Sequence, residues 1–304
     1  AQARPGWVPE PVDTPIDRTT PPDRWANAAT FGALGDGVTD ATAALRRLFA
    51  SGAAVVVLPT GTYVVSDAIE VPRSVRRIVG MNSTLRPASQ RAPGFARTGG
   101  MVRVLTGGPP LEIGRLTFDN TNGGLQVAIE AAGARDVAIR DVVSAGATLL
   151  DRKAGGGRVF IEDVCCGRIT LAGPRPVFAR QLDTEGAGIR ILNDGAPLWI
   201  LGLKTEGVGT IVDNRGGART DIFGGLLYVV RETDGSVPAF RNDASFLSAS
   251  FVEEVLRAGR HYRVYVQQDG GDVPAAAFPA RGMGRMVGTL LAEPSAVGGS
   301  QPDR

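Results

Sequence analysis

The chain has 304 residues, of which 43% are apolar, 6% are aromatic and 41 are glycine. This composition indicates many short strands joined by tight turns rather than a helical bundle. No apolar run approaches the roughly 20 residues of a membrane span, and a formal net charge of +2 gives no basic excess for nucleic acid. We therefore expect neither a membrane-spanning helix nor a nucleic-acid partner.

Residues 1–30 are rich in proline and lack hydrophobic periodicity. This predicts an extended arm that either lies on the rest of the protein or is disordered. Because the chain begins at Ala1 rather than Met, we expect a leader peptide to have been removed, although a truncated chain would begin in the same way. The expected location is therefore secreted, periplasmic or on the cell surface, in a bacterium.

A glycine-rich segment at 35–40 precedes a helical pattern at 40–50. Thr39 or Asp40 can accept hydrogen bonds from the first free amides of that helix. A phosphate-binding loop would need a lysine at a fixed spacing, and none occurs here. We interpret the segment as scaffold, and the apolar stretches at 53–59 and 62–65 as the first strands.

After residue 110 the sequence repeats at intervals of about 22 residues. Apolar or small residues stand at positions one, three, six and eight of each copy, which predicts two short strands separated by a two-residue bend. The residues that open the copies are Leu111, Val137, Val159, Val177 and Leu198. A third short strand recurs between copies, so the repeat predicts a β-solenoid; an ordinary β-sandwich would not keep this phase through five copies.

The segment ATFGALGDGVTDATAAL, followed by AAVVVLPTGTYVVSDAIEVP and RRIVGMNSTL, resembles the N-terminal signature of the pectate-lyase-like superfamily. Glucanases related to glycoside hydrolase family 55 and many phage tailspikes share this signature. The resemblance is close over 29–85 and looser to about residue 230. It implies an all-β, right-handed parallel β-helix, a helix that caps its open N-terminal edge, and carbohydrate as the substrate class.

We therefore expect one β-helix domain at 31–292 after the arm at 1–30. It would have a helix cap at 40–50, regular coils at about 53–230, and a less regular part at 231–292. The last residues, 293–304, are expected to be a disordered tail.

In a β-solenoid the outward residues of neighbouring coils form ladders, so a site is built across coils. The segments DTEG and KTEG fall one coil apart, which places Asp183 beside Lys204 and Glu185 beside Glu206. Two adjacent carboxylates cannot both ionise freely, so one should keep its proton to a higher pH. Glycoside hydrolysis uses such a pair, and a separation of about 5 Å is nearer the retaining geometry.

The resulting hypothesis makes Glu185 and Glu206 the acid/base and the nucleophile or stabiliser, in either order, with Asp183 and Lys204 tuning them. Lys204 could instead be the base of a lyase beside carboxylates that orient a uronate, if its pKa were lowered. The alternative without catalysis is a ladder of ion pairs in which Lys204 neutralises its neighbours.

Two further ladders of charged residues, at the bend between the first two strands of each copy, are interpreted as structural pairing. They consist of Arg140, Glu162 and Arg180, and of Arg115, Asp141 and Asp163. The adjacent Cys165 and Cys166 should point to opposite faces of a strand, which predicts two free thiols.

Weaker candidates for binding substrate lie on the third-strand stack and the turn after it. The residues expected to share a phase there are Asp151, Asn193 and Asp213, with Lys153, Arg190, Asp194 and Asn214 nearby. Asp194 and Asp213 could begin a calcium site, but aspartate and asparagine are also ordinary turn residues. Trp199 shares an outward phase with Phe160 and Phe178; such a stripe can stack on sugar rings, but packing beneath the N-terminal arm or the segment after residue 246 is favoured.

The leading prediction is a secreted glycoside hydrolase that degrades a polysaccharide with paired carboxylates. The alternatives are a uronate lyase on the same fold, and a non-catalytic module that binds glycans or assembles as a tailspike does. The expected partner is a polysaccharide or oligosaccharide, and the exposed faces of a β-helix would allow an oligomer. No metal and no cofactor are expected, apart from the calcium considered above.

Overall fold

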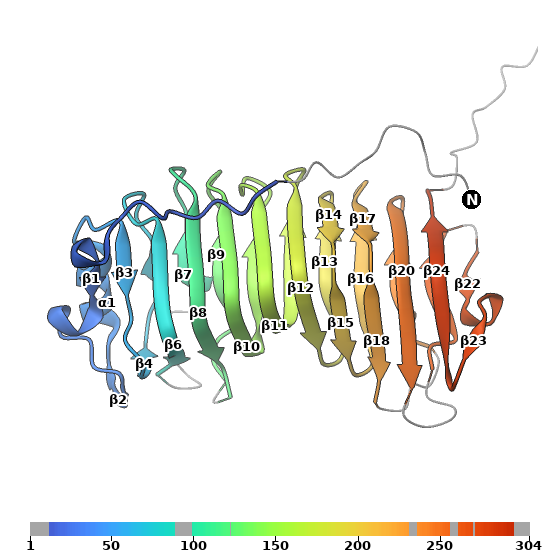
Figure 1. Ribbon diagram of the computed structural model, residues 1–304, viewed down its shortest axis with the longest axis horizontal. Coiled ribbons are helices and arrows are strands. Elements are labelled where there is room, and N and C mark those ends of the chain that lie inside the picture. Colours follow the sequence, from blue (N-terminus) through green and yellow to red (C-terminus); the bar gives the residue numbers. More distant parts are fainter. Residues whose placement is uncertain are drawn as a thin grey trace, which may run out of the picture.

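The computed structural model describes residues 12–88, 99–121, 123–230, 236–255, 261–269 and 271–294. It is a parallel β-solenoid of about ten turns with one short α-helix near the N-terminus (Figure 1). This confirms the predicted fold class. The first eleven residues of the predicted arm and most of the predicted tail lie outside the described residues. No helix in the described ranges is long and apolar enough to cross a membrane.

The N-terminal end contains short elements around one helix, and the coils follow. The first elements are η1 (Pro22–Arg24), β1 (Ala26–Asn27), η2 (Ala28–Phe31), β2 (Asp36–Asp40), α1 (Thr42–Phe49), β3 (Val55–Val57), β4 (Thr62–Val65) and β5 (Ile69–Glu70). The coils continue with β6 (Arg77–Pro87), β7 (Gly100–Val104), β8 (Leu111–Asp119), β9 (Val127–Ala131), β10 (Val137–Arg152), β11 (Val159–Ala172), β12 (Val177–Glu185), β13 (Ile189–Asp194), β14 (Pro197–Ile200), β15 (Leu203–Glu206), β16 (Thr210–Arg215), β17 (Arg219–Ile222) and β18 (Gly225–Val229). The C-terminal elements are β19 (Phe240–Asn242), β20 (Phe246–Val255), β21 (Val264–Gln268), β22 (Val273–Pro274), η3 (Ala275–Ala277), β23 (Ala280–Arg281) and β24 (Gly284–Ala292).

The strands of successive coils pair in the register that the repeat predicts. Val137 of β10 lies beside Leu111 of β8 and Val159 of β11, and Val177 and Leu198 continue the same ladder. These side chains are buried and belong to one apolar core that runs through the solenoid. Burial of this ladder therefore holds each coil on the next.

One residue at the bend of several coils adopts left-handed backbone angles. These residues are Asn82, Arg115, Asp141, Asp163 and Gln181, with φ between 51° and 61°. Asparagine and aspartate enter this region more readily than most residues. The predicted pairing of Arg115, Asp141 and Asp163 is wrong, because the structure records no ion pair among these exposed bend residues. The neighbouring ladder does pair: Glu162 accepts from Arg140 at 2.6 Å and from Arg180 at 3.0 Å.

The N-terminal end is closed by α1, as predicted. Leu45, Leu48 and Phe49 of the helix are buried in the solenoid core. The Asp40 carboxylate accepts a hydrogen bond from the Thr42 amide at 2.9 Å, so Asp40 rather than Thr39 binds the helix start. The glycine-rich segment forms β2 beside β4, and a Cβ on Gly61 would lie 2.7 Å from the Gly35 oxygen. The segment is scaffold.

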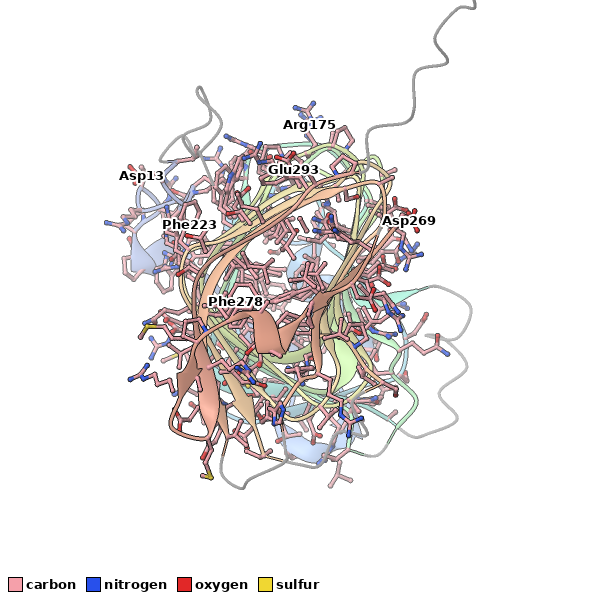
Figure 2. The ribbon with its side chains drawn as sticks, turned by 90° about the vertical axis from the view of Figure 1, so that its right-hand side faces the viewer. Asp13, Arg175, Phe223, Asp269, Phe278 and Glu293 are labelled. Carbon is pink, nitrogen blue, oxygen red and sulfur yellow. The ribbon has the colours of Figure 1, made fainter. Side chains whose placement is uncertain are left out.

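The C-terminal end is closed by antiparallel strands and aromatic rings. β24 pairs antiparallel with β20, whereas the coils before it pair in parallel. Phe251 and Phe278 each pack on Tyr265, with ring centroids 5.0 and 5.6 Å apart. Viewed along the solenoid, Phe278 lies within the outline of the strands (Figure 2). The last coil is therefore covered.

The described part of the N-terminal arm lies along the outside of the coils (Figure 1). Arg180 donates to the Val12 carbonyl at 2.9 Å and to the Thr14 hydroxyl at 3.0 Å, and Thr14 donates to Glu162. Val12 packs against the cluster of Ala138, Phe160, Phe178 and Trp199. This confirms that the aromatic stripe is packed beneath the arm.

Candidate functional site

The two charged segments lie one coil apart, in the predicted register. Asp183 of β12 lies beside Lys204 of β15, and Glu185 lies beside Glu206. The intervening Thr184 is fully buried, so the four charged side chains share the outward face. Cys165 of β11 stands beside Asp183 in the same ladder.

Lys204 lies at the centre of this group. Its ammonium nitrogen is 3.1 Å from Asp183 Oδ2 and 3.0 Å from Glu206 Oε2, and it also donates to Glu185 Oε1. The four side chains remain between 28% and 43% exposed. The group is therefore a compact network of ion pairs that solvent and a ligand can reach.

The titration behaviour differs from the sequence-based hypothesis. Partial burial opposes the charge of Lys204, but the hydrogen bonds that its ammonium donates to Glu185, Glu206 and Asp183 outweigh burial and raise the pKa of the amine. Partial burial also raises the pKa of Asp183, with the nearby Glu185 charge adding to the effect and Lys204 opposing it. The raised pKa thus belongs to Asp183, to which the sequence-based hypothesis gave only a tuning role.

Three adjoining hollows surround the network and together form what we term the Glu185 groove. Two of them, of about 570 and 530 Å³, share Glu185, Gly186 and Ala187. The third, of about 430 Å³, contains Asp183 and Lys204 and shares Cys165 with the first. Small residues, such as Gly146 within β10, Gly167 within β11 and Gly207 after β15, line the groove on successive coils.

The third-strand candidates do not converge on this groove, and two of the expected placements are wrong. Arg190 is fully buried inside the solenoid, where it donates to the Gly186 and Thr184 carbonyls, so it cannot contact a ligand outside. Asn193 is one position out of the predicted phase: it pairs with Asn214, whereas Asp213 pairs with Leu192.

Asn193, Asn214 and Asn242 form a buried ladder that sequence reasoning missed. Asn193 donates to the Asn214 side chain and Asn214 to the Asn242 side chain, both at 3.3 Å. Each stands near the end of a third strand, just before a turn, and that recurrence was the available signal. The ladder satisfies backbone groups at the turns, for instance the Ala196 carbonyl and amide.

The remaining predicted residues have separate surroundings. Asp213 accepts from Arg215 at 3.2 Å, and Asp194 is exposed at the neighbouring turn. Trp199 is half-buried and stacks on Phe178 with ring centroids 4.9 Å apart, beneath the arm. Within the described residues, the group that could hold a metal ion is Cys165, Asp183 and Glu185, whose ligand atoms lie within 4.8 Å of one another. Asp194 and Asp213 are not part of it, and Lys204 already occupies its carboxylates.

A separate hollow of about 730 Å³ lies where α1 meets the second coil. It is lined by apolar residues such as Phe49 and Leu105, and by Arg46, Arg73 and Arg103. None of the predicted site residues lies there.

Comparison with known proteins finds a family match over part of the chain and several distantly similar structures. Residues 25–152 match the family described as rhamnogalacturonase A/epimerase, pectate lyase-like. The match ends before Asp183, so it covers the N-terminal coils and not the Glu185 groove. No curated protein matches the chain.

Among solved structures, the chain is similar to phage proteins and to an adhesin. ORF18 of Geobacillus virus E2 is 13% identical with a TM-score of 0.44, over 77% of this chain and 62% of that one. The N-terminal fragment of bacteriophage phi29 gene product 12 is 15% identical with a TM-score of 0.47, over 80% and 56%. PfbA, a surface adhesin of Streptococcus pneumoniae, is 9% identical with a TM-score of 0.37, over 86% and 98%. The chain thus spans about three fifths of the length of the two phage proteins, and TM-scores below 0.5 support no functional conclusion.

The stacked coils, the helical cap and the bend geometry define a right-handed parallel β-helix. The match to the pectate-lyase-like family covers residues 25–152, which form the first coils of this β-helix.

Proposed function

We propose that this protein binds an extended glycan in the Glu185 groove. The observation that carries the proposal is the run of adjoining hollows that share Glu185, Gly186 and Ala187 and cross several coils. A linear chain needs such a trough, and carboxylates at its wall can accept hydrogen bonds from sugar hydroxyls. The pectate-lyase-like fold and the family match to a rhamnogalacturonase A/epimerase support carbohydrate as the ligand class. The proposal includes a location outside the cell or at its surface.

The test is to fill the groove without touching the ion pairs. Ala187 is exposed and lines both hollows beside Glu185, so Ala187→Trp would obstruct the groove, whereas Ala187→Ser would leave it open. Affinity electrophoresis through gels that contain single polysaccharides measures binding. We expect at least one polysaccharide to retard the wild type and Ala187→Ser, and to retard Ala187→Trp much less. Equal retardation of all three proteins, or none with any polysaccharide, would contradict the proposal.

A second candidate is hydrolysis of the bound glycan, and one observation favours it. Asp183, whose pKa is raised, lies near Glu185, and oxygens of the two carboxylates come within 4.8 Å of each other. A carboxyl group with a raised pKa next to a second carboxyl group is the arrangement that a retaining glycosidase uses. Asp183 would then be the acid and Glu185 the nucleophile, in place of the Glu185–Glu206 pair.

Release of new reducing ends measures hydrolysis. If it occurs, Asp183→Asn and Glu185→Gln should each abolish it while weakening glycan binding only a few fold, whereas Glu206→Gln should reduce hydrolysis less. The uronate lyase alternative is the weakest, because the raised pKa of Lys204 makes the amine a poor base.

A further inference from the structure

The central cation of the Glu185 groove, Lys204, directs its hydrogen-bond donors at the protein itself. An ammonium group has three donors, and those of Lys204 face three carboxylates, on Asp183, Glu185 and Glu206. Arg168, the other cation of the groove, donates its Nε hydrogen to the Ile189 carbonyl at 2.9 Å, which uses one of its five donors. The protein itself therefore uses the donors of Lys204 but not all those of Arg168.

Acceptors, in contrast, remain available. Each of the three carboxylates directs one oxygen at Lys204 and keeps a second. The second oxygen of Asp183, Oδ1, is buried, so the free oxygens that a ligand can reach are those of Glu185 and Glu206. Asp163 adds a fourth carboxylate to the wall of the hollow that contains Lys204. A ligand that donates hydrogen bonds would satisfy these oxygens.

The charge of the groove also favours a ligand that carries hydrogen-bond donors, if that ligand is cationic. Its lining contains four carboxylates, on Asp163, Asp183, Glu185 and Glu206, against the two cations Lys204 and Arg168. The groove is thus net negative at neutral pH. It repels an anionic polymer and attracts a cationic one over distances of about 10 Å in physiological salt.

We propose that the Glu185 groove selects its glycan by hydrogen-bond donors and positive charge, so that it prefers amino sugars to neutral sugars and neutral sugars to uronates. Ammonium groups offer three donors and hydroxyl groups one, whereas a uronate carboxylate offers acceptors only. This inference rests on the proposed glycan binding and specifies the chemical class of the glycan.

The test compares three β-1,4 or α-1,4 linked oligosaccharides of equal length that differ in charge: oligoglucosamine, cello-oligosaccharide and oligogalacturonate. Isothermal titration at mildly acidic pH keeps the amines protonated while most carboxylates stay ionised. We expect oligoglucosamine to bind at least tenfold more tightly than oligogalacturonate, because one unit charge about 5 Å away changes affinity by roughly fourfold even in water. Added salt should narrow the difference.

The variants Glu206→Gln and Asp141→Asn form a matched pair. Each removes one exposed negative charge, but Glu206 lines the groove and Asp141 lies at the bend outside it. Glu206→Gln should weaken oligoglucosamine binding roughly twofold to fivefold, and Asp141→Asn should leave it unchanged.

Two outcomes separate the inference from the proposed function. If oligogalacturonate binds most tightly and Ala187→Trp removes that binding, the groove binds glycans but the inferred selectivity is wrong. If no oligosaccharide and no polysaccharide binds, the proposed function fails and the inference fails with it.

Discussion

Lys204 determines how the charged network behaves. Its ammonium holds Asp183, Glu185 and Glu206 together on the outer face of two coils. Because the side chains are partly exposed, each pair contributes little by itself, and solvent and salt reduce it further. The network should therefore contribute modestly to stability while fixing the carboxylates in place for a ligand.

Replacing this cation tests its structural contribution. At about neutral pH, Lys204→Met should lower the free energy of unfolding by about 1 kcal/mol, since three carboxylates lose their partner. The raised pKa of Lys204 means that its contribution is present below the pKa of an unfolded lysine and is lost as the pH rises through the folded value. In acid the difference in free energy of unfolding between Lys204→Met and the wild type should disappear because the carboxylates are protonated. Urea denaturation at several pH values measures this difference.

Lys153→Met is the matched control, because Lys153 is the other lysine of the chain and pairs with one carboxylate, on Asp151. If Lys153→Met lowers the free energy of unfolding as much as Lys204→Met does, the number of carboxylate partners does not determine the contribution of the lysine.

Glu253 is a buried carboxyl at the C-terminal end. Burial raises its pKa, although the Tyr262 amide at 2.8 Å and the Tyr265 hydroxyl at 2.7 Å donate to it. The folded state then holds the proton more tightly than the unfolded state, so stability falls as the pH rises from about 4.3 through the folded pKa. Glu253→Gln should remove this decrease in denaturation experiments, whereas the exposed neighbour variant Glu254→Gln should retain it. The same pH dependence in both variants would refute the assignment.

At the scale of elements, the sequence correctly predicts which residues of the first two strands of each coil point inward. It predicts the register of the third strand poorly. Apolar alternation places Val137 and its equivalents correctly because the first two strands and their bend keep a constant length. The third strand does not, since the pairing of β10 with β11 shifts register between Ser144 and Leu150. The prediction placed Asn193 one residue out of register with Asp213, although β13 and β16 pair without a shift, and an error of one residue exchanges the inward and outward faces.

The burial of arginine side chains could not be predicted from hydrophobic periodicity either. A pattern assigns arginine to the outside, yet Arg190 is buried because turn carbonyls accept its donors. Such acceptors exist only once the coil has folded. The same applies to Lys204: the ladder was predictable, but its side chain reaches three carboxylates through rotamers that no sequence pattern specifies.

The N-terminal arm is an element whose attachment can be measured. Arg180 connects it to the coils through Val12, Thr14 and Glu162. Arg180→Met should weaken this attachment by about 1 kcal/mol and raise the rate of tryptic cleavage after the exposed Arg18 roughly fivefold. Arg175→Met, which alters an exposed arginine on a nearby turn, serves as control (Figure 2). Unchanged cleavage in Arg180→Met would mean that the arm is held by other contacts.

At the scale of the whole molecule, the ends of the stack need protection because open strand edges recruit other chains. β24 covers the edge of β20, and Gly284 allows the close approach: a Cβ there would lie 1.9 Å from the backbone oxygen of Glu253. Gly284→Ala should therefore displace β24, cost about 2 kcal/mol and cause concentration-dependent association.

Gly288→Ala in the same strand provides the control, because a Cβ at Gly288 meets no atom within 4 Å. Light scattering after size exclusion compares the two variants. A monomeric Gly284→Ala protein with wild-type stability would contradict this role of β24.

Amide hydrogen exchange with and without bound oligosaccharide tests whether the Glu185 groove is the ligand site. We expect new protection in the middle of β10 and β11, and at the ends of β12 and β15 with the turns that follow those two strands, where the adjoining hollows lie. Protection confined to the hollow between α1 and the second coil, or to the aromatic stripe beneath the arm, would contradict it.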